Sequence, residues 1–253
     1  MSEIQLFSYP TSPYAQKVGC YLKYKKLDFK LVGVNPIDNG EIAFTRQKQV
    51  PVLQIGEQWR KESSEIGIWL DEIYPERPII PSVESDREQV FNVDNWVSNS
   101  LIPSLFRYAV EWQNSWYGIT NGWRLSKAVS NATPLPAYIR LLWPFGVKRA
   151  RFIVNMVQSM DLNESIVDMN TRLQHEFIAH LNGEPFLGGQ KSVTLADLSA
   201  FPAVMSGHFM GMKTKQSLRD HPEITEWAKR VYSELPANPL LVADKLLKAH
   251  SIE

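Results

Sequence analysis

The residues best placed to do chemistry lie near the start of the chain, in the stretch Tyr9–Tyr14 (YPTSPY). Ser12 stands where a helix N-cap is expected, and Pro13 suits the first helical position. A helix N-terminus has free N–H groups and partial positive charge, so it favours an anion. Ser12 is either a cap alone or a hydroxyl that donates to the thiolate of a ligand. In the second case it would lower the thiol pKa from about 8.5.

A second feature is Pro51, which directly precedes an apolar stretch at residues 52–55. Proline lacks the N–H that a strand needs, so this position indicates one of two arrangements. One is a trans proline on an edge strand, and the other is a cis bond, found in about 5–6% of X–Pro bonds. A cis bond would turn the backbone of Val50 outward, where it could pair with an extended peptide ligand.

A third feature is Glu62 followed by Ser63, ahead of an amphipathic stretch at residues 63–73. Both residues are typical of a helix start, where Ser63 would be the N-cap. The functional alternative is a second helix N-terminus that holds a carboxylate while Glu62 holds an ammonium. An α-amino acid head group carries both of these charges.

The elements that position these residues follow from hydrophobic periodicity. We expect strands at residues 4–8 and 29–34, a hairpin at 51–60, and helices at 14–26 and 63–73, with a short polar helix or loop at 41–48. Strands interleaved with helices predict a mixed sheet covered by helices. Three prolines in residues 74–81 predict a semi-rigid connector. Beyond it only helical periods recur, at 89–110, 147–160, 165–181, 195–210 and 223–235, with an insertion of short helical pieces at 113–146.

Composition excludes several classes of function. Lys and Arg number 27, as do Asp and Glu, so the zero net charge argues against a general nucleic-acid binder. The single cysteine, Cys20, excludes an internal disulfide, and the five histidines lack an i, i+4 pair, so we expect no metal site. The first residues do not resemble a secretory signal, and no apolar run approaches the ~20 residues of a membrane helix. We therefore expect a cytoplasmic protein that binds neither membrane nor nucleic acid.

Four stretches in this order resemble the serine-type classes of the glutathione transferase family. Residues 7–12 (FSYPTS) followed by Lys17 resemble the turn that carries the catalytic serine, and residues 49–53 (QVPVL) resemble the cis-proline strand. Glu62 and Ser63 resemble the γ-glutamyl-binding turn. Thr194 and Asp197, after residues 186–189 (FLGG), are similar to the capping box of the helical domain.

The resemblance implies a thioredoxin-like α/β domain at residues 1–80, a linker at 81–90 and an all-α domain at 91–253. It also implies a glutathione site with Ser12 as the catalytic residue, Val50 pairing with the cysteinyl unit, and Glu62 with Ser63 at the γ-glutamyl end. Gln49 is a further candidate for contact with glutathione, and Pro51 shapes the site. The family's usual Asn-Pro-x-Gly reads TRQK at residues 45–48, so the family's glycyl-end contacts do not carry over, and Arg46 or Lys48 is a candidate to meet the glycyl carboxylate. Tyr9 and Tyr14 are alternative hydroxyl donors.

The implied function is conjugation of glutathione, as co-substrate and without a metal, to a hydrophobic electrophile by a homodimer. A pocket for apolar electrophiles could be lined by the aromatic series Trp96, Phe106, Tyr108, Trp112, Trp116, Tyr117 and Trp123, although helix-spaced aromatics more often belong to a core. By resemblance to the family, this helical segment would face the glutathione site. Tyr14, Tyr108 and Trp112 are therefore candidates for the second-substrate pocket. The alternative is a non-catalytic binding or assembly protein on the same scaffold. Glutathione-dependent reductase or peroxidase activity is less favoured, because no cysteine lies at the turn.

Overall fold

The N-terminal part of the molecule is built on a mixed four-stranded sheet. The computed structural model describes residues 3–36, 38–146 and 150–252. The strand order is β2-β1-β3-β4, in which β1 runs parallel to β2 and antiparallel to β3, and β3 pairs antiparallel with β4. The parallel pair requires a crossover, which α1 supplies. The strands are β1 (Ile4–Ser8), β2 (Lys30–Gly33), β3 (Val52–Ile55) and β4 (Gln58–Lys61).

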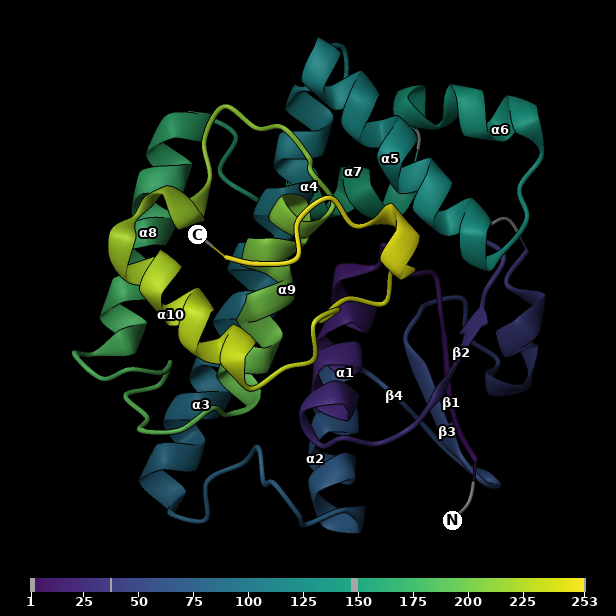
Figure 1. The fold of residues 1–253 in the computed structure, drawn as a ribbon. Helices are drawn as coiled ribbons and strands as arrows, with labels where there is room; N and C mark the ends of the chain where they lie inside the picture. Colours follow the sequence, from purple (N-terminus) through teal and green to yellow (C-terminus); the bar gives the residue numbers. More distant parts are fainter. Residues whose placement is uncertain (1–2, 37, 147–149, 253) are drawn as a thin grey trace.

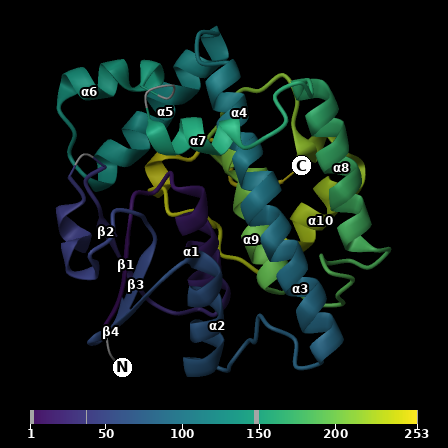
Figure 2. The same cartoon turned by 180° about the vertical axis from the view of Figure 1, so that it is seen from behind.

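The two faces of this sheet have different covers. Leu6 and Phe7 point to opposite faces because side chains alternate along a strand. Leu6 packs in the main core with α1 (Pro13–Tyr24) and α2 (Ser63–Ile73), whereas Phe7 packs with Ile42 of η1 (Gly40–Thr45) in a smaller cluster. Figures 1 and 2 show α1 and α2 between the sheet and the helical part of the chain. The predicted mixed sheet covered by helices is confirmed.

The connection from α2 to the next helix contains the prolines of residues 74–81. The next helix begins at Glu84, inside the stretch expected to be a linker. Glu84 and Asp86 place negative charge in its first turn, which favours a helix start there. The division of the chain into two domains around residues 81–90 stays a prediction.

In the described chain after residue 83, the regular elements are helices, apart from one isolated bridge between Phe186 and Gln190. The buried centre is α9, which packs against α1, α3 and α10. The elements are α3 (Glu84–Trp96), the π-helical turn η2 (Val97–Leu101), α4 (Ile102–Glu111), α5 (Trp116–Ala132), α6 (Ala137–Leu142), η3 (Trp143–Phe145), α7 (Arg151–Gln158), α8 (Ile166–Leu181), α9 (Leu195–Phe209), η5 (Leu218–Asp220), α10 (Pro222–Ser233) and η6 (Asp244–Leu246).

The predicted capping box at the start of α9 is confirmed. The fully buried carboxylate of Asp197 accepts from the backbone N–H of Thr194 at 2.9 Å and from that of Leu187 at 2.9 Å. The indole of Trp227 in α10 also donates to it, at 2.8 Å. Burial raises the pKa of Asp197 to about 6, although these donors oppose the shift. The box therefore ties α9 both to its preceding loop and to α10.

The sequence prediction was wrong for residues 113–146. The stretch contains a 17-residue helix, α5, and not only short pieces. Its periodicity is interrupted by Gly118 and Gly122, which let other chain segments approach closely. A Cβ on Gly122 would lie 2.8 Å from the Cα of Pro144 in η3. Figures 1 and 2 place α5, α6 and α7 together over the end of the sheet where α1 begins.

The sheet and the helices are joined by a buried ion pair. Lys17 of α1 lies 2.8 Å from the carboxylate of Asp94 in α3, and both side chains are almost fully buried. Ser64 of α2 and Ser199 of α9 donate to the same carboxylate, and Lys17 also donates to Ser98 at 2.9 Å. Burial lowers the pKa of Lys17, and the nearby charge of Asp94 opposes that shift. A single carboxylate therefore connects elements from both parts of the chain.

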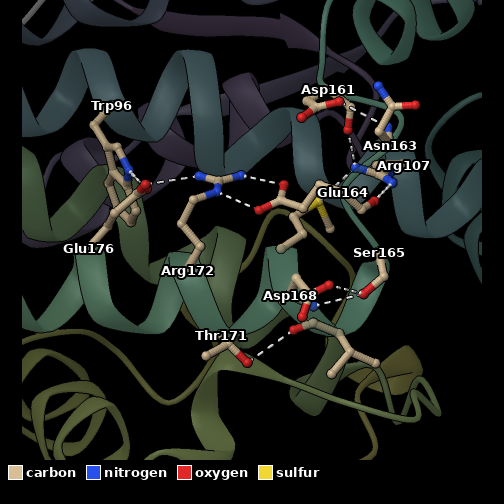
Figure 3. A network of polar contacts seen from close by, with 12 residues as sticks. Trp96, Arg107, Asp161, Asn163, Glu164, Ser165, Asp168, Thr171, Arg172 and Glu176 are labelled. Atoms are coloured by element: carbon tan, nitrogen blue, oxygen red, sulfur yellow. Dashed lines mark hydrogen bonds and ion pairs between the residues drawn. The ribbon is translucent and has the colours of Figure 1, made fainter.

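A second polar network holds the connection between α7 and α8 (Figure 3). The buried guanidinium of Arg107 in α4 donates to the backbone carbonyls of Asp161, at 2.8 Å, and Glu164. Arg172 of α8 makes two hydrogen bonds to the carboxylate of Glu164, at 2.7 and 2.9 Å. Because Arg107 spans this connection, it fixes the end of α7 relative to α4.

Candidate functional site

A large cavity lies between the sheet part and helices α4–α7, with a volume of about 1140 Å³. Pockets for a single ligand usually measure about 300–1,000 Å³, so this one has room for two molecules. Its lining divides by chemistry. The N-terminal half is lined chiefly by polar residues and the turn around Pro51, and the other half is apolar and aromatic. The N-terminal half includes Thr11, Ser12, Lys48, Val50, Glu62 and Ser63.

Ser12 occupies the predicted position at the start of α1. It is the N-cap, and its hydroxyl oxygen accepts from the backbone N–H of Ala15 at 3.4 Å. The residue is only 5% exposed and lines the cavity. Because the oxygen acts as acceptor in the cap, the hydroxyl proton is free to be donated to a bound group.

The Val50–Pro51 peptide bond is cis, so the trans alternative was wrong. The strand that follows, β3, is flanked by β1 and β4 and is not an edge strand. Val50 and Gln49 line the cavity just before β3, and the side chain of Gln47 donates to the carbonyl of Gln49 at 3.0 Å. The backbone of Val50 therefore lies at the cavity next to the start of the strand.

Ser63 was predicted as the N-cap of α2, but the structure places Glu62 at that position. The N-cap is Glu62, whose φ of 60° is unusual for a non-glycine residue, and Ser63 is the first helical residue. Strained backbone of this kind is concentrated at functional sites. The Ser63 hydroxyl, in a residue 6% exposed, makes no hydrogen bond with any described residue and lines the cavity. A helix start, a free hydroxyl and a carboxylate thus meet at one point.

The two tyrosines near Ser12 both line the cavity, and burial raises the pKa of each phenol. For Tyr14 the pKa reaches about 12, with a smaller contribution from the negative charge of Glu62. The hydroxyl of Tyr14 donates to the carbonyl of Ser98 at 2.9 Å, so its proton is already engaged. The structure thus places Tyr14 at the predicted pocket and leaves Tyr9 as the other phenol that could donate there.

Lys48 lines the cavity, whereas Arg46 does not. Arg46 is the C-cap of η1, with a left-handed φ of 58°, and the chain lines the cavity from Gln47 onward. Of the two cations that the sequence offered for a carboxylate at this end, the structure brings only Lys48 to the site.

Tyr108 and Trp112, which were predicted for the second-substrate pocket, are not among the described residues that line this cavity. On α4, Phe106 and Ala109 face the cavity, and Tyr108 lies two positions, about 200°, from Phe106. The Tyr108 hydroxyl donates to Asn170 of α8 at 2.9 Å, and its ring packs against Trp112 with centroids 5.1 Å apart. Both aromatics belong to the packing between helices.

Of the aromatic wall of the cavity, the sequence analysis named Phe106 within a longer aromatic series and missed the other members. Phe106 of α4 and Phe152 of α7 form an edge-to-face pair with centroids 5.8 Å apart. Tyr138 and Leu142, spaced four residues apart on α6, line the opposite portion with Trp143 and Phe145 of η3. The spacing of Tyr138 and Leu142 was a usable signal, because residues four apart share a helix face.

Other candidate chemistry finds no support in the described residues. Burial raises the pKa of Cys20 to about 12, so its thiol is unreactive at neutral pH. Within the described ranges no three His, Cys, Asp or Glu side chains gather as a metal site would require. In the same part of the chain no helix has the length and apolarity needed to span a membrane.

Comparisons with known proteins agree with this geometry. Residues 6–78 match the family model described as glutathione S-transferase, N-terminal domain. Prostaglandin E synthase 2 of Danio rerio is 34% identical over 53 residues, which cover 21% of this chain and 14% of that protein. Glutathione S-transferase Z2 of Arabidopsis thaliana is 30% identical over 116 residues, 42% of this chain and 52% of that protein. In both cases the matched region covers less than two thirds of the relative's own length.

The fold extends the similarity beyond the N-terminal domain. The solved structure of human glutathione transferase theta-2, in complex with glutathione and an unknown ligand, superimposes with a TM-score of 0.60 at 20% identity. The match covers 93% of this chain and 84% of that one. Residues 6–78 thus match a glutathione S-transferase N-terminal domain, and the chain as a whole shares the fold of a solved glutathione transferase.

Proposed function

We propose that this protein binds glutathione and conjugates it, through its sulfur, to a hydrophobic electrophile. One observation carries the proposal: the cavity brings together the Ser12 hydroxyl, the Val50 backbone beside a cis-proline, and the start of α2. A tripeptide with a thiol, a peptide backbone and an amino acid head group needs these three features. The related human theta-2 structure contains glutathione, which supports the choice of ligand.

Each group of the tripeptide has a counterpart in the N-terminal half of the cavity. The γ-glutamyl carboxylate meets the Ser63 hydroxyl and the free N–H groups of α2, while its ammonium meets the Glu62 carboxylate. The cysteinyl unit pairs with the backbone of Val50. The glycyl carboxylate meets Lys48. Gln49 and Pro51 border the same path, so the tripeptide would lie along the edge from α2 to η1.

The proposed mechanism is nucleophilic attack by the bound thiolate. Ser12 donates a hydrogen bond to the sulfur, and the positive end of α1 favours its negative charge. The thiol proton leaves to solvent, the sulfur lone pair forms the S–C bond, and the leaving group departs with its bonding electrons. A thiol pKa lowered by one to two units raises the thiolate fraction near pH 7 about ten-fold or more. The protein itself forms no covalent bond to the substrate.

We also propose that the protein is a cytoplasmic homodimer, as the family resemblance implies. Light scattering on the purified full chain tests the dimer directly, since a dimer would have twice the mass of 29.0 kDa.

Two measurements test the proposed function: calorimetric binding of glutathione, and conjugation of 1-chloro-2,4-dinitrobenzene across pH. We expect Ser12→Ala to lower the conjugation rate about ten- to a hundred-fold and to shift the rising limb of the pH profile upward by one to two units. Glutathione affinity should change by less than about three-fold. Ser165→Ala is the matched control, because Ser165 is also the N-cap serine of a helix, α8, but does not line the cavity, so both measurements should remain unchanged.

The outcomes separate the alternatives. No binding of glutathione by the wild type contradicts the proposal. Binding without conjugation favours a non-catalytic binding protein. Unchanged conjugation in Ser12→Ala limits Ser12 to capping, and loss of conjugation in Tyr9→Phe would then assign the donation to the Tyr9 hydroxyl.

A further inference from the structure

The apolar half of the cavity contains one cation. Among the described residues that line this half, Arg151 at the start of α7 is the only one with a charged side chain. It directly precedes Phe152, whose ring makes the edge-to-face pair with Phe106. Arg151 is exposed and lines the same cavity as these two rings, so a cationic residue lies at the rim of the aromatic wall.

Arg151 has no internal partner in the described chain. Within residues 3–36, 38–146 and 150–252, no hydrogen bond, ion pair or ring contact involves its side chain. Arg107 and Arg172 differ, since both are engaged by carboxylates, and Arg107 also by backbone carbonyls. The neighbouring Lys148 and Arg149 lie outside the described residues. The guanidinium of Arg151 thus remains available to a ligand.

Glutathione does not use this cation in the arrangement proposed above. Its two carboxylates are assigned to the start of α2 and to Lys48, and its ammonium is assigned to Glu62, the only carboxylate among the described lining residues. The start of α2, Lys48 and Glu62 all belong to the N-terminal half of the cavity. Arg151 belongs to the half formed by α4–α7, where the second molecule must bind.

The wall beside Arg151 indicates the shape of that molecule. Phe106 and Phe152 meet with an interplanar angle of 87°, which presents one ring face and one ring edge. Tyr138, Trp143 and Phe145 complete the aromatic lining from α6 and η3. Aromatic rings prefer offset-stacked or edge-to-face neighbours, so such a wall suits a planar aromatic ligand better than a branched aliphatic one.

We infer that the second substrate is a planar aromatic compound with an anionic substituent, a carboxylate or a sulfonate, which pairs with Arg151. Guanidinium groups match the planar geometry of such anions and form charge-assisted hydrogen bonds with them. The inference rests on the proposed function for the reaction that follows. The binding site itself is tested without glutathione or turnover.

The test uses two fluorescent probes that share one aromatic skeleton. 8-Anilino-1-naphthalenesulfonate carries a sulfonate, and N-phenyl-1-naphthylamine lacks it. Both are titrated into the full chain and into Arg151→Gln, Arg151→Lys and Arg140→Gln. Arg140 is the matched control, because it is exposed on α6 and does not line the cavity, whereas Tyr138 on the same helix does.

We expect Arg151→Gln to weaken binding of the sulfonate probe about three- to thirty-fold and that of the neutral probe less than two-fold. Arg151→Lys should retain most of the sulfonate affinity, and Arg140→Gln should change neither probe. Added salt should weaken binding of the sulfonate probe to the wild type but not to Arg151→Gln.

Three results would overturn the inference: equal losses for both probes, equal effects of the Arg140 and Arg151 variants, or no binding of either probe. None of them bears on whether glutathione binds at Ser12. Conversely, failure of the glutathione measurements would leave a selective anion site at Arg151 intact.

Discussion

The two halves of the cavity are built by different means. The N-terminal half depends on backbone: the starts of α1 and α2 and the chain before β3 supply N–H and carbonyl groups. The apolar half depends on side chains from α4, α5, α6, η3 and α7. Backbone groups must be held at particular positions to meet a polar ligand, whereas apolar contact scales with area and is not directional. One half is therefore confined to a narrow set of local sequences, and the other is free to vary.

The largest expected effect is a loss of stability that tests whether the two halves of the cavity depend on the same buried ion pair. Asp94→Ala leaves the buried Lys17 ammonium without its partner, and loss of one member of a buried pair typically costs about 3–5 kcal/mol. Because Asp94 also accepts from Ser64 and Ser199, we expect both halves to loosen together. Chemical denaturation should show the loss of unfolding free energy, and binding of glutathione and of N-phenyl-1-naphthylamine should weaken in parallel.

The double variant Lys17→Met with Asp94→Leu provides the control for this prediction. It removes both buried charges, so it should be more stable than Asp94→Ala alone. A stable Asp94→Ala protein that has lost affinity for only one of the two ligands would show that the halves are held independently.

The second prediction concerns a loss of glutathione binding that should be confined to the N-terminal half of the cavity. Glu62→Gln removes the carboxylate proposed to hold the glutathione ammonium, so we expect KM for glutathione to rise about three- to ten-fold. The kcat value and the affinity for the neutral apolar probe should remain within about two-fold. Glu65→Gln, at an exposed position in the first turn of the same helix, is the matched control. A rise of the same size in Glu65→Gln would mean that general negative charge, and not position 62, matters.

The sequence predicted the N-terminal half of the cavity better than the apolar half. Ser12 as a cap, the strand after Pro51 and the capping box of Asp197 were predicted, because turn and cap chemistry is encoded by residue type within a few positions. The length of α5 was missed because Gly118 and Gly122 weaken a helix intrinsically and are tolerated here through close packing. Phe106, rather than Tyr108, faces the cavity because of the rotation of α4, which depends on contacts with α7 and α8 that are distant in sequence.

A smaller effect should be confined to the apolar half. Gly122→Val introduces a Cβ 2.8 Å from the Cα of Pro144, so η3 must move relative to α5. Because Trp143 and Phe145 of η3 line the cavity, we expect affinity for N-phenyl-1-naphthylamine to fall about three- to ten-fold. Glutathione affinity should remain unchanged. Gly146→Ala serves as the control in the same wall, since its nearest neighbour would lie at an ordinary 3.4 Å. Equal loss of glutathione binding in Gly122→Val would contradict the separation of the halves.

The smallest effect concerns Tyr108, which the sequence suggested as a contact of the second substrate. Tyr108→Phe removes one hydrogen bond to Asn170 and keeps the ring against Trp112, so unfolding free energy should fall by only about 1 kcal/mol. Affinity for the aromatic probes should not change, whereas Phe106→Ala, two residues earlier on the same helix, should weaken both probes. Thermal unfolding and the same probe titrations measure the two quantities. A selective loss of probe binding in Tyr108→Phe would mean that α4 turns a different face to the ligand, and would place Tyr108 in the apolar half after all.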